Sequence, residues 1–131
     1  MPEVRPLYLN GEFCDAGVAD PIVVTNPSNG RCVGKMATVD RDGVRRAIAA
    51  AWEAFDRWRR CDARQRGVYL NKIAAAIEAR SVDFADMITL ENGKPLPQSS
   101  GEVAMAVDHL RWFAEEGRRN YGRVVPPQAS G

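Results

Sequence analysis

A seven-residue stretch at residues 90–96, Leu-Glu-Asn-Gly-Lys-Pro-Leu, constrains the fold most sharply, because it ends one long helical pattern and precedes another. Gly93 suits the position after a helix, since only glycine enters the left-handed backbone region without a steric penalty from Cβ. Pro95 cannot continue the preceding helix, and it restrains Lys94 to extended geometry. We therefore expect two helices joined by a tight turn at this point.

Two small β-hairpins are expected before residue 40. The Asn10-Gly11 pair lies between apolar residues, and Asn-Gly is the strongest short-range hairpin signal because a type I′ turn needs positive φ at both central positions. The β-branched residues 22–25 predict a strand, and the turn residues 26–30 separate it from a return strand over 31–39. Residues 15–21 are expected to form the loop between the hairpins. Such hairpins are marginal alone and need a surface to lie on.

From residue 40 onward, apolar residues recur three and four positions apart, which predicts a series of amphipathic helices. Thr38 or Asp40 is expected to cap the first helix, because short oxygen-bearing side chains accept hydrogen bonds from free N–H groups at a helix start. Asp62 is expected to cap the second helix, in a capping box with Gln65.

Ser81 is expected to cap a third helix, and a fourth is expected to begin near Pro97 and to fade between Gly117 and Gly122. Each helix is expected to bury one stripe of apolar residues. In chain order the stripes are Val44, Ala47, Ile48, Ala51 and Phe55; Leu70, Ile73, Ala74 and Ile77; Phe84, Met87 and Ile88; and Val103, Ala106, Val107, Leu110, Phe113 and Ala114.

These patterns predict an α+β fold with one partial domain over residues 1–131. Residues 1–39 are expected to form the hairpins, 40–122 the helices and 123–131 an extended tail. Strands and helices do not alternate along the chain, so a parallel-sheet core is not expected. The helices therefore carry apolar stripes with little sheet to cover, which indicates that a partner surface is missing.

Composition excludes several classes of function. Of the 131 residues, 45% are apolar and 27% are charged, which is ordinary for a globular protein. The net charge of +1 creates no overall field that would favour nucleic acid or an acidic membrane, and no apolar run is long enough to span a bilayer. The N-terminus shows no apolar signal core, so a cytoplasmic location is expected. Three cysteines and one histidine argue against a disulfide framework and a zinc site.

The cysteines are weak candidates for a nucleophile, because an active cysteine needs a base or positive charges beside it. Cys61 follows Arg59 and Arg60, which meets this need in part, but an incidental thiol at a helix boundary is the simpler interpretation. Cys14 and Cys32 lie in or beside the expected strands, and we interpret them as small apolar residues.

Three other features have ordinary interpretations. His109 has no second histidine to pair with, so a surface histidine is expected there. Glu115 and Glu116 lie in a charged stretch of the last helix and are interpreted as surface carboxylates. Gly93 and Lys94 lack the earlier glycine and the following hydroxyl of a phosphate-binding loop, so we expect a helix end with a solvated lysine.

The only basic cluster is Arg-Trp-Arg-Arg at residues 57–60 together with Arg64 and Arg66. Arginines beside an aromatic ring could grip a nucleic-acid backbone. Asp56 and Asp62 interrupt the cluster, however, so a solvated connector or an internal ion-pair site is the better interpretation. We assign no catalytic, cofactor-binding or metal-binding residue from these patterns, and we expect no nucleic-acid or membrane partner.

Five segments, in this order and spacing, resemble the N-terminal region of the NAD(P)-dependent aldehyde dehydrogenases. They are Leu-Asn-Gly-Glu-Phe at 9–13, Thr-Asn-Pro-Ser-Asn-Gly at 25–30, the stretch at 90–96, Trp-Phe-Ala-Glu-Glu at 112–116 and Tyr-Gly-Arg-Val-Val-Pro at 121–126. The last three are most similar to the succinate-semialdehyde dehydrogenase branch. The resemblance covers nearly the whole chain, from about residue 7 to about residue 126.

The resemblance implies a known chemistry for full-length relatives. They oxidise an aldehyde through a thiohemiacetal on a cysteine, transfer hydride to NAD or NADP, and use a glutamate to activate water. The family's cysteine follows a Gly-Gln pair and its glutamate lies in Glu-Leu-Gly-Gly-Lys; residues 91–94, Glu-Asn-Gly-Lys, lack the paired glycines. No catalytic or cofactor residue is carried over. Some family members hold a structural cation, for which Val24, Thr25 and Glu102 would correspond.

Three hypotheses follow for function. In the first, the chain is an N-terminal piece of a semialdehyde dehydrogenase-like enzyme, inactive alone and without a cofactor of its own. In the second, it is a stand-alone interaction module that docks on aldehyde dehydrogenase subunits, or self-associates, through exposed helix stripes. In the third, the arginine cluster binds nucleic acid, which salt-sensitive retention on DNA or RNA would reveal.

Overall fold

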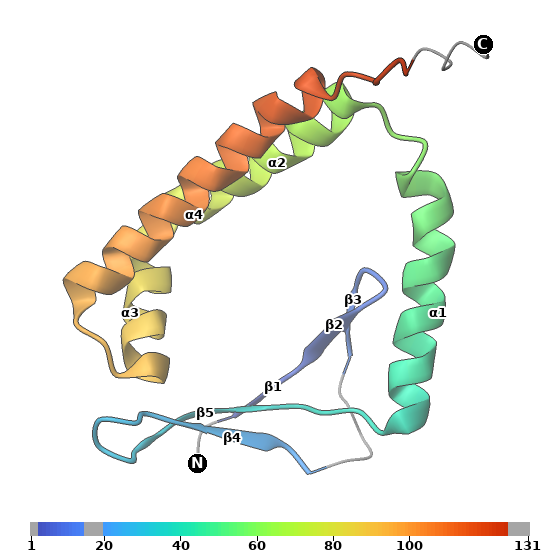
Figure 1. Cartoon of the computed structure of the whole chain (residues 1–131). Coiled ribbons are helices and arrows are strands. Elements are labelled where there is room, and N and C mark those ends of the chain that lie inside the picture. The colour runs from blue at the N-terminus through green and yellow to red at the C-terminus, as the bar shows by residue number, and fades with distance from the viewer. Residues whose placement is uncertain (1–2, 15–19, 126–131) are drawn as a thin grey trace, which may run out of the picture.

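The computed structural model of the chain describes residues 3–14 and 20–125. Short strands at the N-terminal end are followed by four helices (Figure 1). In chain order the elements are β1 (Val4–Arg5), β2 (Leu7–Leu9), β3 (Glu12–Cys14), β4 (Ile22–Thr25), β5 (Cys32–Met36), α1 (Arg41–Trp58), α2 (Ala63–Ala79), α3 (Ser81–Asn92), α4 (Leu96–Glu116) and the 3-10 turn η1 (Gly117–Arg119).

Both expected hairpins are present. Strands β2 and β3 pair antiparallel around Asn10 and Gly11, whose φ angles of 51° and 89° confirm the turn expected there. The rings of Tyr8 and Phe13 meet edge to face across this pair, with centroids 5.1 Å apart. Strands β4 and β5 form the second hairpin, and β5 ends at Met36, so the return strand is shorter than expected.

Strand β1 is an element that the sequence does not predict. It pairs parallel with β5, with Val4 opposite Lys35, and completes a three-stranded sheet in the order β1-β5-β4. A strand of two residues is too short to show an alternating pattern, which explains why sequence periodicity misses it. The expected loop at 15–21 lies mostly outside the described residues, as do residues 126–131 of the expected tail.

The helix boundaries follow the expected signals in most places. Asp40, rather than Thr38, caps α1 by accepting a hydrogen bond from the Gly43 N–H at 2.7 Å. Asp62 caps α2 through the Gln65 N–H at 2.7 Å. The expectation that Ser81 caps α3 is wrong. Arg80 occupies that position without a side-chain cap, because α2 ends at Ala79 and a single residue separates the two helices.

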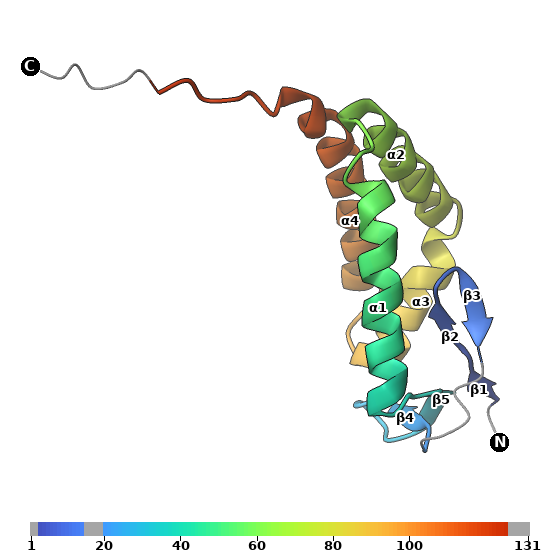
Figure 2. The same cartoon turned by 90° about the vertical axis from the view of Figure 1, so that its right-hand side faces the viewer.

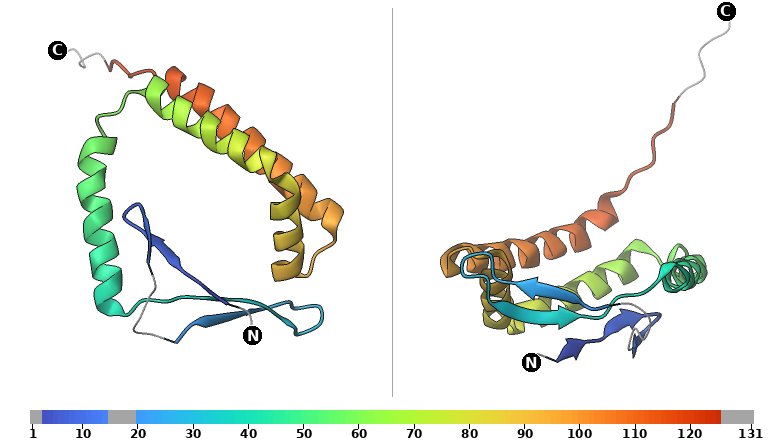
Figure 3. Two further views of the ribbon diagram at one scale, coloured as in Figure 1. Left: turned by 180° about the vertical axis from the view of Figure 1, so that it is seen from behind. Right: turned by 90° about the horizontal axis from the view of Figure 1, so that it is seen from below.

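Helices α2, α3 and α4 form the only packed unit among the described residues, with α2 and α4 running side by side (Figures 1 and 3). Small and medium-sized residues make up its buried centre: Ala74, Ala85, Ser99, Val103, Val107 and Ala114. Gly67 of α2 lies so close to α4 that an added Cβ would come within 2.7 Å of the Ala114 carbonyl oxygen. The absence of a side chain at Gly67 therefore sets the close approach of the two helices.

Helix α1 stands apart from this unit (Figures 1 and 3). The expectation that its apolar stripe is buried is wrong for the described chain, because Gly43 is the only buried residue of α1. Ile73, Ala106 and Phe113 of the other expected stripes are exposed as well. Among the described residues no helix is both long enough and apolar enough to cross a membrane. Residues 120–125 follow η1 and have no regular secondary structure (Figure 2).

Candidate functional site

The turn at residues 90–96 joins the helical unit to the sheet. Gly93 ends α3 with a φ of 70°, which confirms the left-handed position expected there, and its N–H donates to the Thr89 carbonyl at 2.9 Å. A Cβ on Gly93 would lie 2.9 Å from Pro27 Cγ. The end of α3 therefore rests directly on the turn between β4 and β5.

That second turn is built around Asn26, one of two buried polar residues among those described. Its side-chain oxygen accepts hydrogen bonds from the N–H and the hydroxyl of Ser28, at 2.9 and 2.7 Å. Its backbone N–H donates to the Arg31 carbonyl at 2.8 Å. These bonds fix the turn on which Gly93 rests, so the two motifs most typical of the resemblance meet in space.

Side chains on either side of the α3–α4 turn are paired. Lys94 Nζ donates to Glu102 Oε1 at 2.6 Å, so the expectation of a solvated lysine is wrong. The hydroxyls of Thr89 and Ser99 lie 2.8 Å apart, and Ser99 is fully buried. The Glu102 carboxylate, which the resemblance assigns to a structural cation together with Val24 and Thr25, is thus paired with the ammonium group of Lys94.

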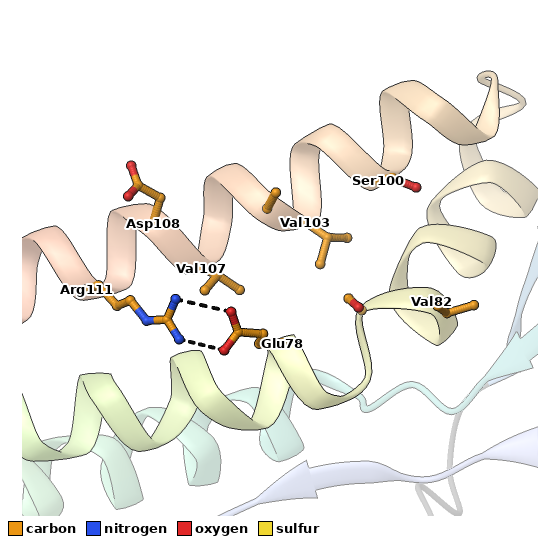
Figure 4. Close-up of a pocket in the computed structure, with 9 residues that line it drawn as sticks. Glu78, Val82, Ser100, Val103, Val107, Asp108 and Arg111 are labelled. Carbon is orange, nitrogen blue, oxygen red and sulfur yellow. Dashed lines mark hydrogen bonds and ion pairs between the residues drawn. The ribbon is translucent and has the colours of Figure 1, made fainter.

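A hollow of about 360 Å³ lies between the end of α2, the start of α3 and one face of α4 (Figure 4). Val103 and Val107 form part of its lining, and Glu78 and Arg111 face each other across it. Their two hydrogen bonds, at 2.6 and 3.2 Å, make a bidentate pair between α2 and α4.

The bidentate pair shifts both of its ionisable groups toward their charged forms. Hydrogen bonds from Arg111, and then its positive charge, hold the pKa of Glu78 below its ordinary value. The same contacts from Glu78 raise the pKa of Arg111, and nearby Asp108 adds a smaller effect in the same direction. The pair thus stays ionised at neutral pH and links α2 to α4 at the protein surface.

The basic cluster lies at the junction of α1 and α2, and four of its five arginines are exposed: Arg57, Arg59, Arg60 and Arg64. Arg66 donates to the carbonyls of Trp58 and Arg59 at 3.2 and 3.1 Å, and its guanidinium lies 5.6 Å from the centroid of the Trp58 ring. Arg59 pairs with Asp56 within α1 at 2.9 Å. Two of the cluster's arginines are thus engaged within the protein, Arg59 in an ion pair on the surface and Arg66 with backbone carbonyls.

The remaining candidate residues are dispersed over the described part of the chain. Cys14, Cys32 and Cys61 are all free thiols, and Cys61 makes only a long 3.8 Å contact to the Arg57 carbonyl. His109 is exposed on α4. Glu115 and Glu116 each pair with Arg119, at 3.9 and 3.0 Å, which agrees with surface carboxylates.

NAD or NADP does not fit the described residues. A dinucleotide needs a glycine-rich turn where a parallel strand leads into a helix, with free N–H groups for the pyrophosphate. In the described part of the chain a strand leads into a helix only between β5 and α1. There the Asp40 carboxylate already binds the Gly43 N–H and would repel a phosphate.

The exposed apolar face of α1 is the strongest candidate interface. It comprises Val44, Ile48, Trp52 and Phe55, which follow the spacing of one helix side. Ile48 is 63% exposed and Trp52 75%, and the rings of Trp52 and Phe55 stack with centroids 5.6 Å apart. Large apolar side chains gathered on one exposed face are typical of interaction surfaces.

The family model of the aldehyde dehydrogenase family matches residues 14–131. The chain belongs to the aldehyde dehydrogenase family. The resemblance found in the sequence motifs is thereby confirmed.

Two curated relatives illustrate the similarity. The NADP(+) succinate-semialdehyde dehydrogenase of Escherichia coli K12 is 40% identical over 118 residues, which is 90% of this chain and 24% of that protein. The glutarate-semialdehyde dehydrogenase of Pseudomonas putida KT2440 is 39% identical over 119 residues, or 91% of this chain and 25% of that protein. The aldehyde dehydrogenase chain thus spans about a quarter of the length of these relatives.

Solved structures agree with this placement. A lactaldehyde dehydrogenase from Escherichia coli superposes with a TM-score of 0.92 at 29% identity, over 100% of this chain and 28% of that one. A succinate-semialdehyde dehydrogenase from Burkholderia pseudomallei gives a TM-score of 0.87 at 34% identity, over 95% and 26%. The α+β fold therefore matches the N-terminal part of the aldehyde dehydrogenase fold, as expected from sequence.

Sequence reasoning missed the residues that organise these sites. The Glu78–Arg111 pair joins α2 to α4, and the Lys94–Glu102 pair joins the α3–α4 turn to α4. No spacing rule within one helix reports either pair. Trp52 lies four positions after Ile48, so helical spacing alone could have added it to the α1 stripe.

Proposed function

We propose that this chain is the N-terminal segment of an NAD(P)-dependent semialdehyde dehydrogenase. Its role is to supply outer helices and hairpins that pack on the remaining polypeptide, which contributes the reactive cysteine, the water-activating glutamate and the cofactor strands. In this proposal the chain alone binds neither NAD nor NADP and oxidises no aldehyde. Succinate semialdehyde, or a dicarboxylic semialdehyde of similar length, is the substrate proposed for the assembled enzyme.

One observation carries the proposal. The chain is similar over nearly its whole length to about a quarter of these enzymes, and in it the apolar face of the long helix α1 is uncovered. The other three helices bury residues against each other, whereas α1 has no such neighbour within residues 3–14 and 20–125. A protein surface that complements α1 would remove this face from water and stabilise the assembly.

The same face supports a second candidate function, a stand-alone module that docks on aldehyde dehydrogenase subunits or on another copy of itself. Co-purification with such a subunit at a fixed stoichiometry would favour the module over the enzyme segment. Both functions belong to a cytoplasmic protein in this proposal, because three free cysteines suit a reducing compartment.

A chimeric enzyme tests the proposal. The matching N-terminal quarter of the Escherichia coli succinate-semialdehyde dehydrogenase is replaced by this chain, and succinate-semialdehyde-dependent NADPH formation is measured. We expect activity from the chimera and none from the purified chain alone or from the relative without its N-terminal quarter. An inactive chimera would count against the enzyme-segment function, and activity of the chain alone that is lost on replacing one cysteine would overturn it.

A further inference from the structure

We propose that Arg66 is a positioning residue that locks the elbow between α1 and α2. By doing so it fixes the direction in which α1 presents its apolar face. The lock follows from contacts within this chain, and only its use in docking rests on the proposed function.

The need for a lock arises from the isolation of α1. Among the described residues, only Gly43 of α1 is buried, and the sheet and the packed helices lie at opposite ends of this helix (Figure 1). Residues 59–62 form the short connection from α1 to α2. The angle of α1 relative to α2 therefore depends on this connection, and on the sheet at the other end of α1, rather than on packing along the helix.

Arg66 belongs rigidly to α2. Its backbone N–H donates to the Asp62 carbonyl at 3.1 Å, which places it in the first turn of the helix. The Asp62 side chain caps that turn through the Gln65 N–H. A contact between the Arg66 side chain and α1 therefore ties the first turn of α2 to α1.

The side chain of Arg66 reaches the C-terminal end of α1. Its terminal nitrogen donates to the carbonyls of Trp58 and Arg59, and its guanidinium carbon lies 5.6 Å from the centroid of the Trp58 ring. The helix dipole makes the carbonyls at a helix end negative, although the Trp58 carbonyl also accepts from the Cys61 N–H at 3.1 Å. One planar cation thus donates to two carbonyls at the end of α1 and lies within cation–π distance of the adjacent ring.

A further observation supports a fixed elbow. The Trp58 ring also lies 5.8 Å from the ring of Tyr69 on α2, so Trp58 is close to two residues of that helix. Arg66 Nε is buried and has no hydrogen-bond partner among the described residues. This unpaired donor is a cost that the two carbonyl bonds and the ring contact offset.

Distance measurement between spin labels tests the lock directly. In the full chain with Cys14, Cys32 and Cys61 replaced by serine, labels on the exposed residues Ala54 of α1 and Ala106 of α4 report the elbow. Wild type is expected to give one narrow distance distribution. Arg66→Met is expected to widen it about twofold, because the planar fork that bridges two carbonyls is lost.

Two controls separate a lock from general structural support. A reference label pair on Lys72 of α2 and Ala106 of α4 should keep its wild-type width in Arg66→Met, because the packed unit does not involve Arg66. Arg64→Met removes another exposed arginine of the same cluster and should leave both distributions unchanged. A wider reference pair together with a wider elbow would mean that Arg66 supports the whole unit, and would overturn the proposal.

Two other results would also overturn the lock: an elbow distribution equally narrow in wild type and Arg66→Met, or equally broad in both. If Arg66→Met does not fold, Arg66→Lys keeps the charge without the planar fork, and an unchanged elbow in that variant overturns the proposal. An inactive chimera, together with a narrow wild-type distance distribution that widens in Arg66→Met, would count against the proposed function and leave the lock in place. Failure of the proposed function and failure of the lock are therefore distinguishable.

Discussion

At the scale of single residues, the contact between Gly93 and Pro27 joins the helical unit to the sheet. A glycine is required there for two separate reasons, its φ of 70° and the nearness of the proline ring. Gly30 has the same φ of 70° but open space around its Cβ position. A comparison of Gly93 with Gly30 therefore separates the free-energy cost of backbone strain from the cost of crowding.

Gly93→Ala is expected to lower the free energy of unfolding by about 1–2 kcal/mol from left-handed strain, and by a further ~1 kcal/mol from the clash with Pro27. Gly30→Ala should show the strain alone, about 1–2 kcal/mol. Urea unfolding followed by circular dichroism measures both values. Equal losses in the two variants would show that the proline ring moves aside and that the contact does not hold the turns together.

The Glu78–Arg111 pair predicts a pH dependence with a definite sign. Because the pKa of Glu78 is lowered in the folded state from its ordinary 4.5, the pair stabilises the fold above that pH. This stabilisation is lost as the pH falls from 4.5 through the lower folded-state pKa. A carbon NMR titration of Glu78 should give a midpoint below 4.5, and Arg111→Met should return it toward 4.5. An unchanged midpoint in Arg111→Met would contradict the pairing.

At the scale of helices and strands, α2 and α4 depend on a close crossing at Gly67. An alanine Cβ there would meet the Ala114 carbonyl oxygen at 2.7 Å, and neither atom belongs to a flexible side chain. Gly101 of α4 also lies inside a helix but has no atom within 4 Å of its Cβ position. The two positions form a matched pair for testing the crossing.

Gly67→Ala is expected to lower the free energy of unfolding by about 1–3 kcal/mol, because the two backbones must move apart. Gly101→Ala should instead raise it by about 0.5–1 kcal/mol, since alanine is the better helix former. Thermal unfolding of both variants in the same buffer measures these changes in the free energy of unfolding. Stabilisation by Gly67→Ala would mean that α2 and α4 do not touch at this point.

The sequence predicts elements whose signals are local and misses those set by partners far along the chain. Asp40, Asp62 and Gly93 act within one turn of the backbone, so their roles can be predicted from spacing. Burial cannot be predicted from spacing, because the apolar face of α1 has the same spacing as a buried stripe and yet is exposed. Strand β1 and the Glu78–Arg111 pair likewise depend on residues about thirty positions away along the chain.

For the candidate site, sequence motifs identify the family but not the geometry. The segments at 25–30 and 90–96 look like separate turns, and only the fold brings Pro27 against Gly93. Arg66 appears in the sequence as one of five arginines clustered near Trp58, and nothing in its spacing distinguishes it from Arg64. Its role becomes visible only when the end of α1 turns back toward α2.

At the scale of the whole molecule, the apolar face of α1 separates folding of this chain from its assembly with other protein. Ile48 lies in the middle of that face and is 63% exposed, so an acidic residue there meets water in the isolated chain. In an assembled enzyme the same carboxylate would be buried without a partner. A substitution at Ile48 should therefore affect assembly far more than folding.

Ile48→Glu is expected to change the free energy of unfolding of the isolated chain by less than about 0.5 kcal/mol, as exposed substitutions usually do. In the chimera it should lower succinate-semialdehyde-dependent NADPH formation at least about tenfold, because burial of an unpaired carboxylate opposes assembly. Glu53→Gln, on the opposite side of α1, should leave both quantities unchanged. Full activity of the Ile48→Glu chimera would show that α1 stays exposed in the assembled enzyme, whereas equal loss in both variants would point to a general defect in α1.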